Sequence, residues 1–141
     1  MQGIDIRPLK MRLRGEIKAW RRNLEPGWKA AADERIRGRV LALREYAACN
    51  TLLTYVSLPI EVDTLGLIAR AFADGKKVAA PRCIEGTHEM EFYEISSMDD
   101  LAPQTFGVLE PVRERCRLLA DFSGSVCLVP ALAYDRDIQD Y

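Results

Sequence analysis

The most informative pattern of apolar and polar positions lies at residues 51–64. The run Thr51–Ser57 is apolar and rich in β-forming residues, which predicts a short buried strand. Pro59 ends that strand, because proline has no N–H for the ladder. Asp63 or Thr64 then offers an N-cap to the apolar pattern that follows.

Glu61 is therefore expected between the carboxyl end of a strand and the amino end of a helix. Ligands bind at that edge of open α/β sheets. A carboxylate in this place either contacts a ligand or is a solvated loop residue that stiffens the helix start. Position alone favours the second interpretation.

Three amphipathic patterns with helical spacing accompany this strand. Residues 9–24 carry apolar side chains three or four positions apart, after the start signals Asp5 and Pro8. A second helix is expected over about residues 29–48 and a third over 64–73, with Gly75 as its stop. The side chains expected on the inner faces of the second and third helices are Ile36, Val40, Leu43, Ala47, Leu65, Ile68, Ala69 and Phe72.

Further strands follow the third helix. Lys77–Pro81 is expected to pair in parallel with the first strand, so residues 51–81 form a β-α-β unit with a right-handed crossover. Met90–Ile95 alternates as a strand does, and residues 105–111 contain a short extended piece. The unbroken apolar run from Val126 to Pro130 is typical of a central parallel strand. The sequence predicts a single α/β domain over residues 1–141.

Composition narrows the possible functions. The chain has 141 residues, of which 48% are hydrophobic and 29% charged, as in ordinary globular proteins. It has neither an apolar run of about 20 residues nor the apolar segment of a secretory signal at its start, so we expect a cytoplasmic protein with no membrane contact. Residues 1–46 carry 12 Lys or Arg against 6 Asp or Glu, so this segment could bind nucleic acid, a polyanionic cofactor or the acidic remainder of its own chain. Aromatic interleaving and helix-turn-helix or finger spacing are missing, which argues against nucleic acid.

The cysteines give no sign of a metal cage. Cys49, Cys83, Cys116 and Cys127 form no C-x-x-C pair, and His88 is the only histidine. A Cys–His nucleophile is formally possible, but buried reduced thiols fit the sequence better.

Lys10 and Arg14 lie four residues apart on one flank of the first helix, with Arg21 two turns further on. Such a flank is either simply solvated or a phosphate-binding element that combines an ammonium with a forked guanidinium.

Six short motifs, in order along nearly the whole chain, resemble the 5-formyltetrahydrofolate cyclo-ligase family, also called 5,10-methenyltetrahydrofolate synthetase. They are Lys10-x-x-Leu13-Arg14, Tyr55-Val-Ser-x-x-x-Glu61-Val-Asp-Thr64, Gly75-Lys-x-Val78-x-x-Pro81, Met90-x-Phe92, Gly107-Val-Leu-Glu-Pro111 and Leu128-Val-Pro-x-Leu-Ala-Tyr-Asp135. Each motif alone is weak, but their order and spacing make the match specific.

The resemblance implies a three-layer α/β/α fold with a mostly parallel central sheet. It also implies an ATP- and Mg²⁺-dependent cyclisation of 5-formyltetrahydrofolate, which can carry several glutamates, to 5,10-methenyltetrahydrofolate. Lys10 and Arg14 match the family's ATP-binding positions, and Val56 and Glu61 match positions in its folate site. Met90 and Phe92 either contact the folate or pack in the core.

The family pattern continues into a Gly-rich phosphate loop with a Mg²⁺-binding Asp, whereas this sequence stops at Tyr141 and its nine glycines all stand singly. The resemblance thus implies a C-terminally truncated domain with no metal ligand of its own, which we expect to be inactive by itself. Two alternatives stay open: a non-catalytic folate- or nucleotide-binding module, and a sugar-phosphate or acyl-CoA enzyme on a similar scaffold. Oligomeric state is not predicted.

Overall fold

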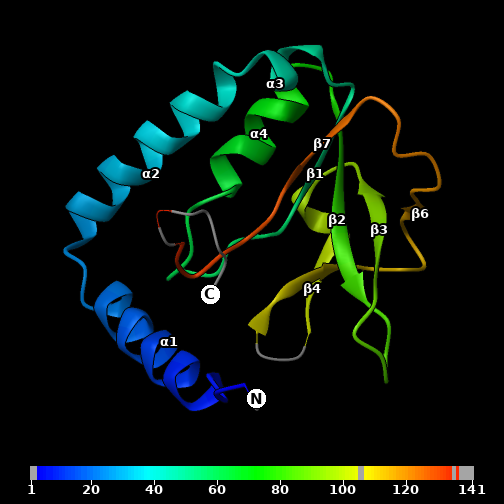
Figure 1. Cartoon of the computed structure of the whole chain (residues 1–141). Coiled ribbons are helices and arrows are strands. Elements are labelled where there is room, and N and C mark those ends of the chain that lie inside the picture. The colour runs from blue at the N-terminus through cyan, green and yellow to red at the C-terminus, as the bar shows by residue number, and fades with distance from the viewer. Residues whose placement is uncertain (1–2, 105–106, 135, 137–141) are drawn as a thin grey trace.

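A computed structural model describes residues 3–104, 107–134 and 136 (Figure 1). The part of the residue 105–111 prediction that concerns Thr105 and Phe106 lies outside this range, as does Asp135 of the last motif. In chain order the elements are α1 (Arg7–Arg22), α2 (Pro26–Leu41), α3 (Arg44–Ala48), β1 (Thr51–Thr54), α4 (Leu65–Ala73), β2 (Lys77–Cys83), β3 (Met90–Ile95), a 3₁₀ turn (Met98–Asp100), β4 (Leu101–Pro103), β5 (Leu109–Pro111), β6 (Arg117–Leu118) and β7 (Ser125–Leu128).

The central sheet has five strands in the order β6-β3-β2-β1-β7. Strand β1 pairs in parallel with β2 on one side and with β7 on the other, while β3 and β6 add antiparallel to the β2 side. The α/β class and the parallel β-α-β unit are confirmed. The run from Val126 to Pro130 was expected as a central strand, but within the described residues β7 lies at the edge of the sheet.

The two faces of the sheet are covered differently. On one face Leu52 and Val78 are fully buried beneath Ile68 and Ala71 of α4, and the hairpin of β4 and β5 packs beside them. On the other face Leu53 and Ala79 are covered by Leu119 from the segment after β6, rather than by a helix of the described chain. In Figure 1 the helices accordingly gather on one side of the strands.

Helix α4 ends where Gly75 was expected to stop it. Gly75 has φ +76°, and its N–H donates to the carbonyl of Phe72 at 3.0 Å. The N–H of Lys76 donates to the carbonyl of Ala71 at 2.9 Å, which completes a Schellman motif. The inward face of α4 was predicted only in part, because Leu65 and Ala69 are exposed and Leu67 is buried instead. The side of the helix that faces the core carries residues 67, 68 and 71.

The second helix was expected to run unbroken to residue 48, and that prediction was wrong. Helix α2 ends at Leu41, and Leu43 has an extended backbone (φ −69°, ψ 140°) that starts the short helix α3. The break turns Leu43 outward, where it is 48% exposed, and leaves Tyr46 as the buried residue of α3. Ile36 and Ala47, also expected inside, are exposed.

Helix α1 forms as its pattern predicts, but its apolar stripe is not buried. None of its residues is buried, and the side chains of Leu9 and Trp20 are about three-fifths exposed (60% and 59%). Figure 1 shows α1 set apart from the sheet.

The four cysteines are free thiols. Cys49 is buried as expected, whereas Cys83 and Cys127 are exposed, because they lie at the end of β2 and in the edge strand β7. Among the described residues, no helix is long and apolar enough to span a membrane.

Candidate functional site

The loop that joins β1 to α4 is held in one conformation by side-chain hydrogen bonds. The N–H of Ser57 donates to Oγ1 of Thr64, and the N–H of Thr64 donates to Oγ of Ser57, both at 3.0 Å. Thr64 Oγ1 also donates to the carbonyl of Tyr55 at 2.8 Å. Asp63, rather than Thr64, caps α4, because its carboxylate accepts from the N–H groups of Leu65 and Gly66.

Glu61 is half-buried in this loop and has a structural contact of its own. Its Oε1 accepts a hydrogen bond from the N–H of Leu58 at 2.7 Å, and its own N–H donates to the carbonyl of Leu58 at 3.0 Å. One carboxylate oxygen therefore closes the turn. The same contact fixes the carboxylate in place, as a rigid ligand-binding group requires.

The side chain of Tyr55 lies under the loop. Its hydroxyl donates to the carbonyl of Val62 at 2.9 Å. Burial, and next the negative charge of Glu61, raise the pKa of Tyr55 to about 12. The phenol is therefore a neutral hydrogen-bond donor at physiological pH.

Arg21 connects α1 to two loops that are distant in sequence. Its guanidinium donates to the carbonyl of Ile60 at 3.2 Å and to the carbonyls of Ala131 and Leu132 at 3.2 and 2.5 Å. Guanidinium groups suit this task because their donors form a rigid fork. The contact holds the carboxyl-terminal half of α1 against the loop that carries Glu61.

A cavity of about 680 Å³ opens between α1, the Glu61 loop and the segment after β7. This volume is within the usual range of ligand sites. Glu61 is the one acid among the described residues of its wall. Five cations come from α1, and the remaining wall is apolar or backbone; these residues are Lys10, Arg14, Lys18, Arg21, Arg22, Leu58, Ile60, Pro130, Ala131 and Leu132.

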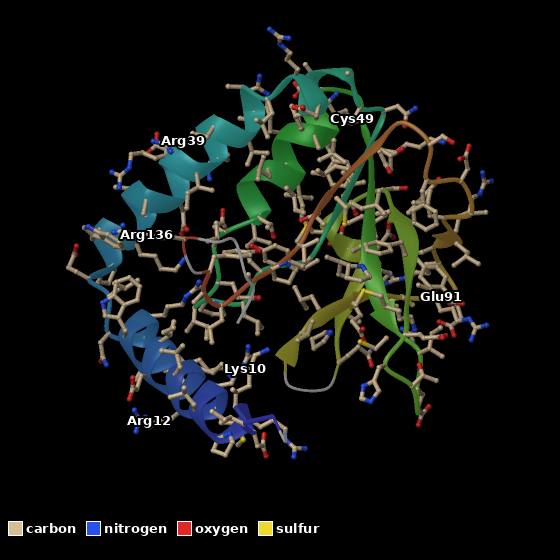
Figure 2. All side chains as sticks on the ribbon, viewed as in Figure 1. Lys10, Arg12, Arg39, Cys49, Glu91 and Arg136 are labelled. Carbon is tan, nitrogen blue, oxygen red and sulfur yellow. The ribbon has the colours of Figure 1, made fainter. Side chains whose placement is uncertain are left out.

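The basic wall is one side of α1, not the whole helix. Figure 2 shows Lys10 on the side of α1 that faces the rest of the molecule and Arg12 on the opposite side. Arg12 pairs weakly with Glu16 at 3.6 Å, and both side chains are well exposed. The cavity therefore presents an excess of positive charge that attracts anions, phosphates above all.

A smaller hollow of about 180 Å³ adjoins the basic cavity and shares Arg21, Ile60 and Glu61 with it. Trp20 and Trp28, the two tryptophans of the chain, meet edge to face there with ring centroids 6.3 Å apart. The hollow gives the site an aromatic side next to its charged one.

The structure brings three of the predicted site residues to one place. Lys10, Arg14 and Glu61 all line the basic cavity. Val56 does not line it: this side chain is 5% exposed and belongs to the core cluster with Leu52 and Ile68. Met90 is 55% exposed at the start of β3, likewise outside the cavity wall.

Lys18 and Arg22 were not singled out from the sequence, although both line the cavity. Their signal was present, because they continue the four-residue spacing from Lys10 and Arg14 along the same side of α1. Spacing alone could not distinguish cavity-lining cations from a solvated basic flank, because a helical pattern does not show which loop of the chain faces the helix.

Comparisons with known proteins agree on one family. The sequence model of the 5-formyltetrahydrofolate cyclo-ligase family matches residues 7–137. A probable 5-formyltetrahydrofolate cyclo-ligase of Schizosaccharomyces pombe is 33% identical over 103 residues, which cover 71% of this chain and 50% of that protein. The 5-formyltetrahydrofolate cyclo-ligase of Mus musculus is 26% identical over 148 residues, 97% of this chain and 70% of that protein.

Two solved structures share the fold. A 5,10-methenyltetrahydrofolate synthetase of Aquifex aeolicus superposes with a TM-score of 0.76 at 24% identity, over 90% of this chain and 63% of that one. One from Mycoplasma pneumoniae gives 0.67 at 18% identity, over 91% and 67%. The chain thus spans between half and about two-thirds of the length of most of these relatives.

Proposed function

The chain belongs to the 5-formyltetrahydrofolate cyclo-ligase family, and from this premise we propose that it serves the ATP-dependent cyclisation of 5-formyltetrahydrofolate to 5,10-methenyltetrahydrofolate. The observation that carries the proposal is the basic wall of α1 facing the Glu61 loop across one cavity. That arrangement places an anion site, suited to the nucleotide, and a carboxylate, suited to the folate, in one cavity.

In the proposed reaction, the formyl oxygen attacks the γ-phosphorus of ATP, and ADP leaves. N10 of the folate then attacks the activated formyl carbon, and loss of phosphate leaves the methenyl bridge. Little covalent chemistry falls to the protein, whose task is to position the two ligands and neutralise phosphate charge. We assign Lys10 and Arg14 to the phosphates of ATP.

Glu61 is assigned to the folate. A fixed carboxylate can accept paired hydrogen bonds from the ring N–H and amino group of a pterin. Its contact with the N–H of Leu58 supports this role, because that contact holds the carboxylate at the cavity wall without neutralising its charge. Val56 and Met90 stay predicted folate contacts. Val56 lies in the core, so it can affect folate binding indirectly by supporting the loop that carries Glu61.

Magnesium is the expected companion of ATP in this family. The described residues contain no group of three or more acids, histidines or cysteines that could hold a metal ion. Magnesium is commonly held by one or two carboxylates together with substrate phosphates. The roles above are therefore assigned without placing the ion.

Calorimetry with ATP and with 5-formyltetrahydrofolate tests the proposal. Lys10→Ala should weaken ATP binding by up to about fivefold and leave folate binding nearly unchanged, since one exposed charge contact is lost. Glu61→Gln keeps an acceptor for Leu58 but removes the charge, and it should weaken folate binding by a similar factor. Arg12→Ala, on the outward side of α1, is the matched control.

Near-ultraviolet absorbance of the methenyl product, measured with and without ATP and Mg²⁺, separates turnover from binding. Product formation supports the full reaction. Binding of both ligands without product would identify the chain as a binding module only. Failure to bind either ligand, in a folded preparation, would overturn the proposal.

A further inference from the structure

The segment that carries Glu61 is attached to α2 as well as to α1 and β1. The N–H of Asp63 donates to Oδ1 of Asp33 on α2 at 3.3 Å. Arg21 and Tyr55 already hold the two backbone carbonyls on either side of Glu61. The contact with Asp33 therefore supplies the third hold on this segment, from an element that neither of the other two belongs to.

Asp33 is itself held in one conformation. Its side chain is only 14% exposed, and its Oδ2 accepts a hydrogen bond from Nζ of Lys29 at 2.7 Å. Lys29 and Asp33 are four residues apart on α2, the spacing at which opposite charges pair on a helix. One oxygen of the carboxylate thus binds within α2, and the other binds the backbone of the Glu61 segment.

Arg37, one turn further along α2, contacts the side chain of the same residue. Its Nη1 lies 3.5 Å from Oδ2 of Asp63. That carboxylate also caps α4, since it accepts from the N–H groups of Leu65 and Gly66. Helix α2 therefore holds Asp63 twice, through its backbone by Asp33 and through its side chain by Arg37.

Gly66 leaves the space that Arg37 occupies. A Cβ at this position would lie 2.5 Å from Nη1 of Arg37 and 3.0 Å from its Cζ, closer than side chains pack. Glycine is otherwise an unfavourable residue inside a helix. Its presence in the first turn of α4 fits a position that must admit the guanidinium beside Asp63.

These contacts add little to the core of the domain. Helix α2 has no buried residue, and the core clusters described above include none of its side chains. Partly exposed ion pairs also contribute little to stability. What the contacts do fix is the backbone next to Glu61, and a binding group needs neighbours whose own conformations are fixed.

We propose that Asp33 and Arg37 are positioning residues for the folate: acting through Asp63, they hold Glu61 where its carboxylate meets the pterin. The inference rests on the proposed function, which assigns Glu61 to the folate. Neither side chain is among the described residues that line the basic cavity. Both therefore act through the loop, and ATP, assigned to Lys10 and Arg14, should be nearly indifferent to them.

Calorimetry with 5-formyltetrahydrofolate and with ATP tests the role of Asp33. Asp33→Ala removes one hydrogen bond from the segment and should weaken folate binding about fivefold, with less than a twofold change for ATP. Asp33→Asn keeps an acceptor for the N–H of Asp63 and should restore folate affinity to within about twofold. Glu34→Ala, which removes the same charge from the exposed neighbouring position on α2, is the control and should change neither affinity.

Arg37 is tested in two ways. Arg37→Ala should weaken folate binding about threefold. Gly66→Ala should have the same effect by displacing the guanidinium, although alanine favours the helix. A loss of folate affinity without a loss of stability separates positioning from damage to the fold. Arg39→Ala, exposed on the outward side of α2 in Figure 2, is the control.

Coupling to Glu61 decides the matter. In Glu61→Gln no carboxylate is left to position, so adding Asp33→Ala should weaken folate binding by less than about 1.5-fold. Independent, multiplying losses overturn the inference, as does an unchanged folate affinity in Asp33→Ala, and both leave the proposed function standing. Equal losses of folate and ATP affinity also overturn it, because α2 would then serve the whole fold. If the unmodified chain does not bind the folate, the proposed function and the inference both fail.

Discussion

Replacing Arg21 by Met should detach α1 without unfolding the domain. The substitution keeps an apolar stem of similar reach but removes the donors to Ile60, Ala131 and Leu132. Helix α1 has no buried residue that could compensate for this loss. The core around β1 and α4 includes no residue of α1, so global unfolding should change little.

The size of the effect follows from the three hydrogen bonds. Each contributes roughly 1 kcal/mol net, so their loss lowers the free energy of docking α1 by about 3 kcal/mol. That change alters the ratio of docked to detached helix by about a hundredfold. A ligand that binds only the docked form loses affinity by at most the same factor.

Hydrogen exchange of the α1 amides and calorimetry with ATP measure the two consequences separately. In Arg21→Met, protection of α1 should fall while amides of β1 and β2 keep theirs. ATP affinity should fall as well, although Arg21 itself is not assigned to the phosphates. Arg21→Lys should recover only part of either loss, because an ammonium cannot reproduce the fork.

Arg12→Met is the control, since Arg12 points outward and its one ion pair among the residues that the structure describes is the exposed pair with Glu16. It should alter neither quantity appreciably. Unchanged α1 protection and ATP affinity in Arg21→Met would refute the argument that this one side chain positions the helix. A fall in protection throughout β1 and β2 would refute the claim that docking is local.

Two further changes test the loop and the helix stop. Gly75→Ala forces a side chain to adopt φ +76° and should lower the free energy of unfolding by about 1–2 kcal/mol in denaturant titrations; an unchanged value would contradict the assigned Schellman motif. The pKa of Tyr55 is raised from 10.0 to about 12, so its neutral hydroxyl stabilises the fold fully below pH 10, and this contribution is lost as the pH rises toward 12. Unfolding experiments should therefore show a steeper loss of stability between pH 10 and 12 for the unmodified chain than for Tyr55→Phe, and parallel curves would refute the shift.

Features set by local chemistry could be predicted from the sequence. The β-α-β unit was found because neighbouring residues mark most of its elements, as Gly75 marks the end of α4. Strand β3 was predicted with its observed ends for the same reason. The first strand was expected to reach Ser57 with Pro59 as its stop, but β1 ends earlier, at Thr54. The break before Leu43 was missed, because nothing in the apolar spacing marks the extended backbone that starts α3 there.

The site was predictable where helical spacing and a strand end supplied its residues. Lys10, Arg14 and Glu61 came from those two signals, and the structure places all three on one cavity. The role of Arg21 could not be read from the sequence, because its acceptors are backbone carbonyls of residues 60, 131 and 132. Every residue has a backbone carbonyl, so the amino-acid types at these positions give no sign that they accept hydrogen bonds from Arg21.

The order of the strands also has a consequence for how the chain folds during synthesis. Strand β1 has its two neighbours at very different distances along the sequence: Thr51 pairs with Lys77 on one side and with Ser125 on the other. The β-α-β half can form soon after residue 83 is made, but one flank of β1 stays unpaired until β7 emerges. Such long-range pairing slows folding and leaves a hydrophobic strand open to other nascent chains in the meantime. Slower translation of the segment between β2 and β7 would lengthen that interval, so synonymous codons there should affect the yield of folded protein more than codons elsewhere.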